Sequence, residues 1–287
     1  MELVLRGARP LAEAAFLSFE GPSDSLIIDA TNLTFACPLD LAGVVATAHW
    51  ASECSMSIVF KMPTDSGAAS YLQRMDVLRH MPSRTVILGR VPPEGRGDHR
   101  GTLLEVTALN RRNADDLAER LGPLVKNFYA GQSAAAGTAV FVACGELLTN
   151  AVEHGDSNTG AFIVAQTYTG TTTEEQRFEF AVCDTGVGVM DHLKKNPEHA
   201  YLTRDELAIK KAIVAGVSGI GTDRRGNGLS DVIERTRTHG AVSFQIRSGK
   251  GEVKVSGSPE SHTEVPKDRP DQTSGTWAWL SHRVPNR

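Results

Sequence analysis

The sequence predicts an α/β protein of two domains, and three observations lead to this prediction. Strand patterns alternate with helical patterns along the first 90 residues, which is typical of an α/β layer architecture. The segment Val91–Asp98, with two prolines and two glycines in eight residues, interrupts the alternation. A long apolar helical stripe and two strand patterns follow it. Because 287 residues is also the length of about two domains, we expect one domain over residues 1–100 and another over residues 101–287.

The N-terminal domain is expected to consist of strands joined by helices. Apolar residues repeat at helical spacing in two places, and three short apolar runs have the length of buried strands. The predicted strands are Leu26–Ala30, Ser57–Lys61 and Arg84–Leu88, and the predicted helices are Leu39–Trp50 and Tyr71–Arg79.

The C-terminal domain is expected to begin with two helices, Ala114–Tyr129 and one that starts at Val140. The second has apolar residues at Val140, Ala143, Cys144, Leu147, Leu148 and Ala151, an unbroken stripe that Gly155 would end. Two strands, Ala161–Thr169 and Arg177–Asp184, follow. Near the end we expect a hairpin, 241–247 with 252–255, closed by Ser248-Gly-Lys-Gly, then a polar, mobile insertion over 256–274 and a last strand at 276–281.

Composition and charge exclude several classes of protein. No apolar stretch approaches the ~18 residues of a membrane span, and the N-terminus lacks the apolar core of a signal peptide. The net charge of −4 is evenly spread, which argues against a surface for nucleic acid or for a membrane. The four cysteines are far apart and the histidines lack metal-ligand spacing. We therefore expect a cytoplasmic protein with reduced thiols.

Three polar side chains share one face of the helix that starts at Val140. Glu146, Asn150 and His154 are each four residues apart, so they lie above one another opposite the apolar stripe. A solvated helix face would show the same residue types. Packing does not require a carboxylate, an amide and an imidazole in this order, so they are candidate functional residues.

A second candidate segment follows a predicted strand. The strand ends at Asp184, and the chain then turns through Gly186 and Gly188. Glycines allow the backbone to approach a ligand closely. An ordinary Asp-x-Gly turn is the alternative interpretation.

A third candidate segment precedes a helical pattern. It contains Arg225, Gly226, Gly228 and Leu229. Glycines at the start of a helix expose N–H groups to an anion, and arginine adds positive charge. A flexible loop would have the same composition.

Together and in this order, the three segments resemble the motifs of the GHKL (histidine-kinase-like) ATPases. Glu146–Gly155 resembles the N-box, Asp184-Thr-Gly-Val-Gly the first glycine box, and Arg225-Gly-Asn-Gly-Leu the second. The resemblance covers residues 110–287 and is nearest in style to the anti-sigma-factor serine kinases. It implies a Bergerat-type α/β sandwich, with helices over a mixed sheet.

The resemblance also implies cofactors, ATP and Mg²⁺, and a role for each motif. Asp184 would accept a hydrogen bond from the adenine amino group, Asn150 would offer its oxygen to Mg²⁺, and Glu146 would be the catalytic base. A lid would extend from Val214 to Gly226. The implied cofactor-binding residues are Asn150, His154, Asp184, Gly186, Gly188, Arg225, Gly226, Gly228, Leu229 and, with less direct support from the motif, Thr276.

The implied function is that of a regulator whose nucleotide state controls a protein partner. Three versions remain open: a protein serine/threonine kinase that phosphorylates the partner, a slow ATPase, and a non-catalytic nucleotide-sensing module. Glu146 argues against the last version, since binding alone does not need it. The chain has no histidine phospho-acceptor motif upstream, so autophosphorylation is not expected. A homodimer is compatible with each version.

The N-terminal domain resembles STAS domains more faintly. Leu26–Ala30 followed by the segment to Leu41 is similar to their strand–turn–helix, in which a serine at the helix start is phosphorylated. Here that place is taken by Cys37-Pro-Leu-Asp40, which has no hydroxyl group. A generic α/β domain is the alternative. We therefore expect a STAS-like binding module without a phosphorylation switch.

Overall fold

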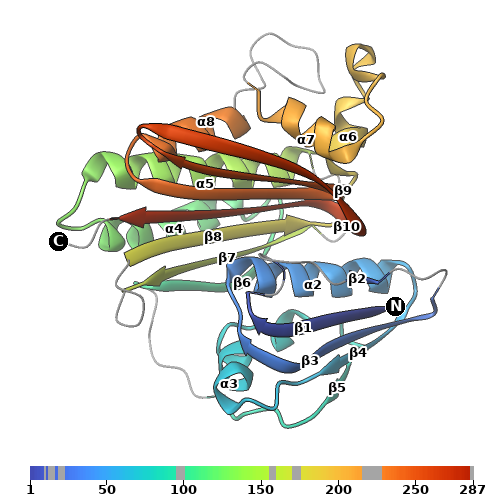
Figure 1. The fold of residues 1–287 in the computed structure, drawn as a ribbon. Helices are drawn as coiled ribbons and strands as arrows, with labels where there is room; N and C mark the ends of the chain where they lie inside the picture. The colour runs from blue at the N-terminus through green and yellow to red at the C-terminus, as the bar shows by residue number, and fades with distance from the viewer. Residues whose placement is uncertain are drawn as a thin grey trace.

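The protein has a mixed α/β fold built on two five-stranded sheets (Figure 1). The computed structural model describes residues 1–9, 11, 17–18, 23–94, 101–154, 160–169, 176–214 and 228–284. The first sheet has the strand order β2-β1-β3-β4-β5, and the second has the order β6-β7-β8-β10-β9. The predicted α/β class is confirmed.

The first sheet is parallel apart from its short edge strand β2. The expected strands and the first helix are present, and the second helix begins and ends five residues earlier than expected and is followed by a 3-10 turn. A first strand, β1, was not predicted. The elements are β1 Glu2–Ala8, β2 Leu17–Ser18, β3 Ser25–Phe35, α2 Pro38–Glu53, β4 Ser57–Lys61, α3 Ser66–Arg74, η1 Leu78–His80 and β5 Val86–Leu88.

The second sheet is antiparallel between all its neighbouring strands. It begins with β6, which was also not predicted, and the helix with the apolar stripe is longer than expected. The elements are β6 Leu103–Leu109, α4 Ala114–Phe128, α5 Ala134–His154, β7 Ala161–Tyr168, β8 Gln176–Asp184, α6 Gly188–Leu193, η2 Pro197–His199, α7 Asp205–Ala212, α8 Gly228–Arg237, β9 Ala241–Ser258 and β10 Ser261–Val284.

The expected hairpin near the C-terminus is wrong. Residues 241–258 form one strand, β9, whose partner is β10, and residues 249–251 are part of β9. The segment 256–274, expected to be a mobile insertion, lies largely within β10 and pairs with β9 from Ser261↔Ser258 to Asp268↔Gly251. Its side chains are mostly exposed, so its composition is polar although its backbone is hydrogen-bonded as a strand. Hydrophobic alternation could not reveal it.

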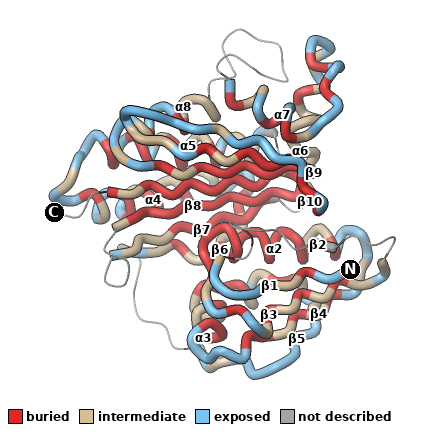
Figure 2. The backbone as a smooth tube through the Cα atoms, viewed as in Figure 1, coloured by how far each residue is buried: buried red, intermediate tan, exposed pale blue. Residues whose placement is uncertain are grey.

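Helix α2 lies between the two sheets (Figures 1 and 2). Every residue from Pro38 to Ala48 is buried. One face of α2 packs on the first sheet, and the other packs on β7, β8 and β10. Trp277 and Trp279 of β10 belong to the same hydrophobic cluster as α2. The hydrophobic core is therefore continuous across residue 100, where the sequence predicted a domain boundary.

Helix α2 approaches the second sheet closely at Gly43. A Cβ atom on Gly43 would lie 2.8 Å from Cζ3 of Trp277 and 3.0 Å from Cδ1 of Leu11. A side chain here would push the helix away from the indole ring.

Gly43→Ala is expected to lower the free energy of unfolding by ~1–3 kcal/mol, because overpacking outweighs the gain in helix propensity. Gly145→Ala in α5 is the matched control, since a Cβ there would meet no atom within 4 Å. That variant should gain ~0.5–1 kcal/mol. Urea unfolding of both variants measures the difference, and equal effects would contradict the close packing of α2 on Trp277.

The N-terminus of α2 is held by a buried carboxylate. Cys37 is the N-cap residue and Pro38 the first helical residue. Asp40 accepts hydrogen bonds from the backbone N–H of Cys37 (2.7 Å) and of Leu11 (2.6 Å). A carboxylate of the chain itself therefore lies at the positive end of the helix dipole.

The opposite face of the second sheet is covered by α4, α5 and α8. Among the helices of the described chain, α5 is long and apolar enough to cross a membrane by length and composition alone. Its predicted stripe is buried in the core, from Val140 to Leu148. Contact with the sheet and with the neighbouring helices accounts for its apolar character. All four cysteines are free thiols, and Cys54 is the exposed one.

Candidate functional site

Asp184 is buried at the end of β8, where the sequence analysis expected it. Its Oδ1 atom accepts hydrogen bonds from the backbone N–H of Gly186 (2.8 Å) and of Thr276 (3.1 Å). Within the described part of the chain, Oδ2 accepts no hydrogen bond. One oxygen therefore holds the surrounding loops, and the other has no donor among the described residues.

Glycines allow the backbone segments around Asp184 to approach one another. Gly275 has a φ of +66°, and a Cβ atom on it would overlap the carbonyl and carboxylate oxygens of Asp184. Gly188 has a φ of +78°, and a Cβ atom on it would lie 2.7 Å from Oγ of Ser248. Both positions need glycine for conformation and for space. Of the predicted residues, Gly186, Gly188 and Thr276 are thus brought together with Asp184.

Ser248 is a residue of this site that the sequence analysis did not identify. Its hydroxyl donates a hydrogen bond to the carbonyl of Gly275 (2.9 Å) and accepts one from the N–H of Val189 (2.8 Å). It links the segment that follows β8, at Val189, to Gly275 of β10. Ser248 had been interpreted as part of a hairpin turn, and its pairing with Thr276 in the register of β9 and β10 could not be read from the sequence.

The environment of Asp184 disfavours its charge. Burial raises the pKa of Asp184 to about 6, against the opposing effect of the two N–H donors. A carboxylate is therefore present at neutral pH, but no cation among the described residues pairs with it. Such a perturbed group at the end of a strand is typical of binding and catalytic sites.

This shift predicts a pH-dependent stability. Because the pKa of Asp184 is higher in the folded protein than its ordinary value of 3.8, the folded state binds the proton more tightly. The stabilising contribution is complete below pH ~4 and disappears as the pH rises through ~6, for a loss of about 3 kcal/mol. Urea unfolding of the protein and of Asp184→Asn from pH 4 to 7.5 measures it. A difference between the two proteins that stays constant with pH would contradict the shift.

Two further candidate residues lie on α5. Glu146 and Asn150 are half-buried, on the side away from the buried stripe. The Nδ2 atom of Asn150 is buried and has no hydrogen-bond partner among the described residues. Buried amide groups are rarely left unpaired, so this atom indicates a missing partner. His154 is the last residue of α5, and its side chain lies outside the described residues.

The topology brings the motifs to one end of the second sheet. Ala161, at the start of β7, pairs with Asp184, and only six residues separate it from the end of α5 at His154. Helix α8 packs on α5 and begins at Gly228, and the half-buried Leu229 contacts the core. Arg225, Gly226 and all but the first residue of the expected lid lie outside the described residues.

The segment that follows Gly188 is hydrogen-bonded to β9 at Lys250. The Oδ2 atom of Asp205, the first residue of α7, accepts a hydrogen bond from the N–H of Lys250 (2.9 Å). Side chains at Gly249 and Gly251 would collide with Asp205 and with the backbone of Glu206. Gly249 and Gly251 therefore allow the start of α7 to pack closely against β9. Helix α7 leads directly toward the predicted lid.

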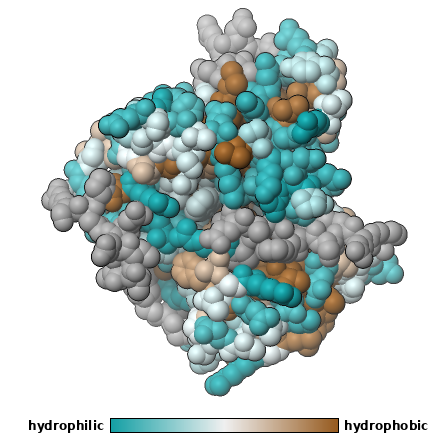
Figure 3. Space-filling view, viewed as in Figure 1, coloured by the Kyte–Doolittle hydropathy of each residue, from teal (hydrophilic) through white to brown (hydrophobic). Residues whose placement is uncertain are grey.

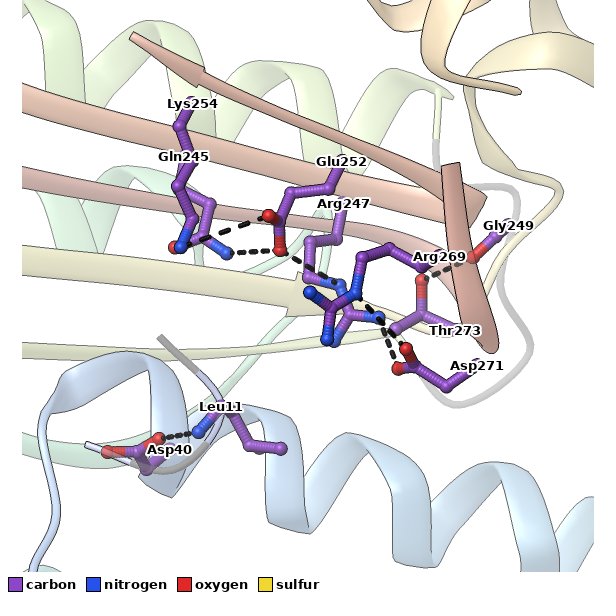
Figure 4. Close-up of polar contacts among 10 residues, drawn as sticks. All are labelled: Leu11, Asp40, Gln245, Arg247, Gly249, Glu252, Lys254, Arg269, Asp271 and Thr273. Carbon is purple, nitrogen blue, oxygen red and sulfur yellow. Dashed lines mark hydrogen bonds and ion pairs between the residues drawn. The ribbon is translucent and has the colours of Figure 1, made fainter. Parts of the chain in front are cut away.

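A buried cluster of charged residues lies on β9 and β10 near Gly249 (Figure 4). Arg247 is fully buried and forms an ion pair with Asp271, which also binds Arg269 at 3.2 Å. The Nε atom of Arg247 lies 3.9 Å from Glu252, which accepts a hydrogen bond from Gln245. Because Arg247 precedes Ser248 in β9, these pairs fix the part of the strand that carries the serine.

No known protein family, curated protein or solved structure matches the chain in comparisons of sequence and fold. Among the described residues there is also no group of three or more His, Cys, Asp or Glu side chains that could hold a metal ion. A metal at this site would need other ligands besides these side chains.

Proposed function

We propose that the protein binds ATP with Mg²⁺ at the end of the second sheet and is a regulator of the GHKL type. The main support is Asp184, a buried carboxylate with one oxygen bound to two backbone N–H groups and the other open to a donor. The exocyclic amino group of adenine is such a donor, whereas guanine presents a carbonyl at that position. A carboxylate acceptor would therefore favour ATP over GTP.

The residues on α5 fit the phosphate end of the same ligand. The buried Nδ2 atom of Asn150 has no partner among the described residues. The oxygen of the same amide is a suitable ligand for Mg²⁺, which keeps most of its other positions for water and phosphate. ATP would supply a transferable phosphoryl group. Glu146, one helical turn before Asn150, would orient or deprotonate the attacking hydroxyl or water.

The position of α2 suggests how nucleotide could affect a protein partner. Thr276 donates its N–H to Asp184, and the next residue, Trp277, faces α2 at Gly43. A shift at the nucleotide site would therefore reach the N-terminal, STAS-like half through one peptide unit. This contact favours the second candidate function, a nucleotide-sensing module that acts through the STAS-like half without turnover.

Two measurements test these functions. Calorimetric titration with ATP and with GTP, each with Mg²⁺, should give binding of ATP only, and equal affinity for the two nucleotides would contradict the adenine site. Incubation with γ-labelled ATP and a host lysate then separates the versions. Label in a protein partner indicates a serine/threonine kinase, free labelled phosphate indicates an ATPase, and neither indicates a sensing module. A cytoplasmic location is part of this proposal, since ATP, Mg²⁺ and reduced thiols occur there together.

A further inference from the structure

The first sheet has one face that no described helix or strand covers. Helices α2 and α3 lie on the same face of this sheet, since Leu72 of α3 belongs to the hydrophobic cluster of α2. On the opposite face the side chains are half-buried or exposed. Parallel sheets are almost always covered on both faces, because their strands are apolar on both sides. An open face on a parallel sheet therefore requires an explanation.

The register defines what this face presents. Ile27, Val59 and Val86 are paired in one row across β3, β4 and β5. The next row on the same face contains Asp29, Lys61 and Leu88, and β1 extends the two rows with Glu2 and Val4. These eight residues are called the outer face below. Val86 and Leu88 are 53% and 49% exposed, and hydrophobic side chains are visible at the surface in this part of the molecule (Figure 3).

The charges of the outer face are balanced at its centre. Nζ of Lys61 lies 2.9 Å from Oδ2 of Asp29, so each charge already has its counter-ion within the face. Such a pair can be covered by an apolar neighbour without leaving a charge unpaired. Glu2 and Arg6 of β1 are exposed on the same side of the sheet and add one charge of each sign. A nucleic acid or a strongly charged peptide would therefore find no net charge to bind here.

We propose that the outer face is the contact between two copies of this chain. A two-fold axis through the face would place apolar residues of β4 and β5 against their equivalents, with each Lys61 able to reach the partner copy's Asp29. This arrangement packs the first sheet of one copy face to face against the first sheet of the other copy, as in other packed sheets. The proposal does not depend on the proposed function, because Asp184 and its loops belong to the other sheet.

Sedimentation equilibrium of the full chain from about 1 to 100 μM tests this proposal, a range that brackets weak and moderate association. The wild-type protein should approach twice the mass of one 30.8 kDa chain. The double variant Val86→Lys/Leu88→Lys should raise the dissociation constant roughly 100-fold or more, because two apolar contacts are replaced by like charges facing one another.

Val265→Lys is the matched control. Val265 is 52% exposed, close to the 53% of Val86, but lies on β10 of the other sheet. It should leave the dimer unchanged. Circular dichroism and ATP binding should be the same in all three proteins, so loss of the dimer is separable from loss of the fold or of nucleotide binding. A monomeric wild type, a dimer that survives the double variant, or equal weakening by Val265→Lys would each overturn the proposal.

Discussion

Asp184→Asn is expected to weaken ATP binding by roughly 10- to 150-fold, the equivalent of about 1.5–3 kcal/mol for a hydrogen bond to a charged acceptor. The substitution is unusually selective in this structure. The amide oxygen of asparagine can take the place of Oδ1 and still accept the N–H groups of Gly186 and Thr276. Only the open oxygen is changed, and it becomes an NH₂ group that faces the donor of adenine. Isothermal titration calorimetry at pH 7.5 measures the loss.

Asp191→Asn is a suitable control for this variant. Asp191 is exposed on α6, a few residues further along the same segment, and its substitution removes the same charge. It should leave affinity unchanged. The Asp184→Asn protein should also be more stable than wild type at neutral pH, because it no longer buries a charge that is present only above pH ~6. Unchanged ATP affinity in Asp184→Asn would show that the adenine site is elsewhere.

Glu146→Gln is expected to lower turnover by roughly 100-fold or more while ATP affinity stays within a few-fold, since a general base contributes to the reaction rather than to ground-state binding. The glutamine has the same size and keeps the helix. Phosphate release or phosphotransfer under saturating ATP measures the rate, and calorimetry measures affinity. Asn150→Ala should instead weaken the Mg²⁺-dependent part of binding.

Glu153→Gln controls for the loss of a carboxylate on α5. Glu153 is exposed one residue before the end of the helix and should have no effect on turnover. Equal loss of binding in Glu146→Gln and Asn150→Ala would indicate damage to α5 rather than separate roles. A protein without measurable turnover in any condition would favour the nucleotide-sensing alternative.

Local sequence patterns predicted those helices and strands whose formation depends on residues close together in the sequence. The stripe from Val140 to Leu148 predicted a core helix, and the strand that ends at Asp184 was placed correctly. These succeed because helical spacing and continuous apolar runs directly reflect burial. The candidate residues Glu146 and Asn150 followed from their position opposite the stripe.

Features that depend on distant pairing could not be predicted. Residues 261–274 of β10 are polar and include prolines, and their strand conformation comes from hydrogen bonds to β9. Ser248 acquires its role from Gly275 and Val189, which are 27 and 59 residues away. Likewise, the spacing of apolar residues in α2 predicted a helix with one buried face, but a second sheet buries the other.

The burial of α2 has a consequence for how the chain is made. At roughly 5–20 residues per second, a ribosome needs roughly 10–50 seconds to synthesise the residues that separate α2 from Trp277. During this interval the first sheet can form, but the side of α2 that will meet β7, β8 and β10 has nothing to pack against. The nascent chain therefore exposes a hydrophobic surface of α2 well before all the strands that will cover this surface have been synthesised. We expect the nascent chain to need chaperones that bind this surface during translation. We also expect a fragment of residues 1–100, expressed alone, to aggregate.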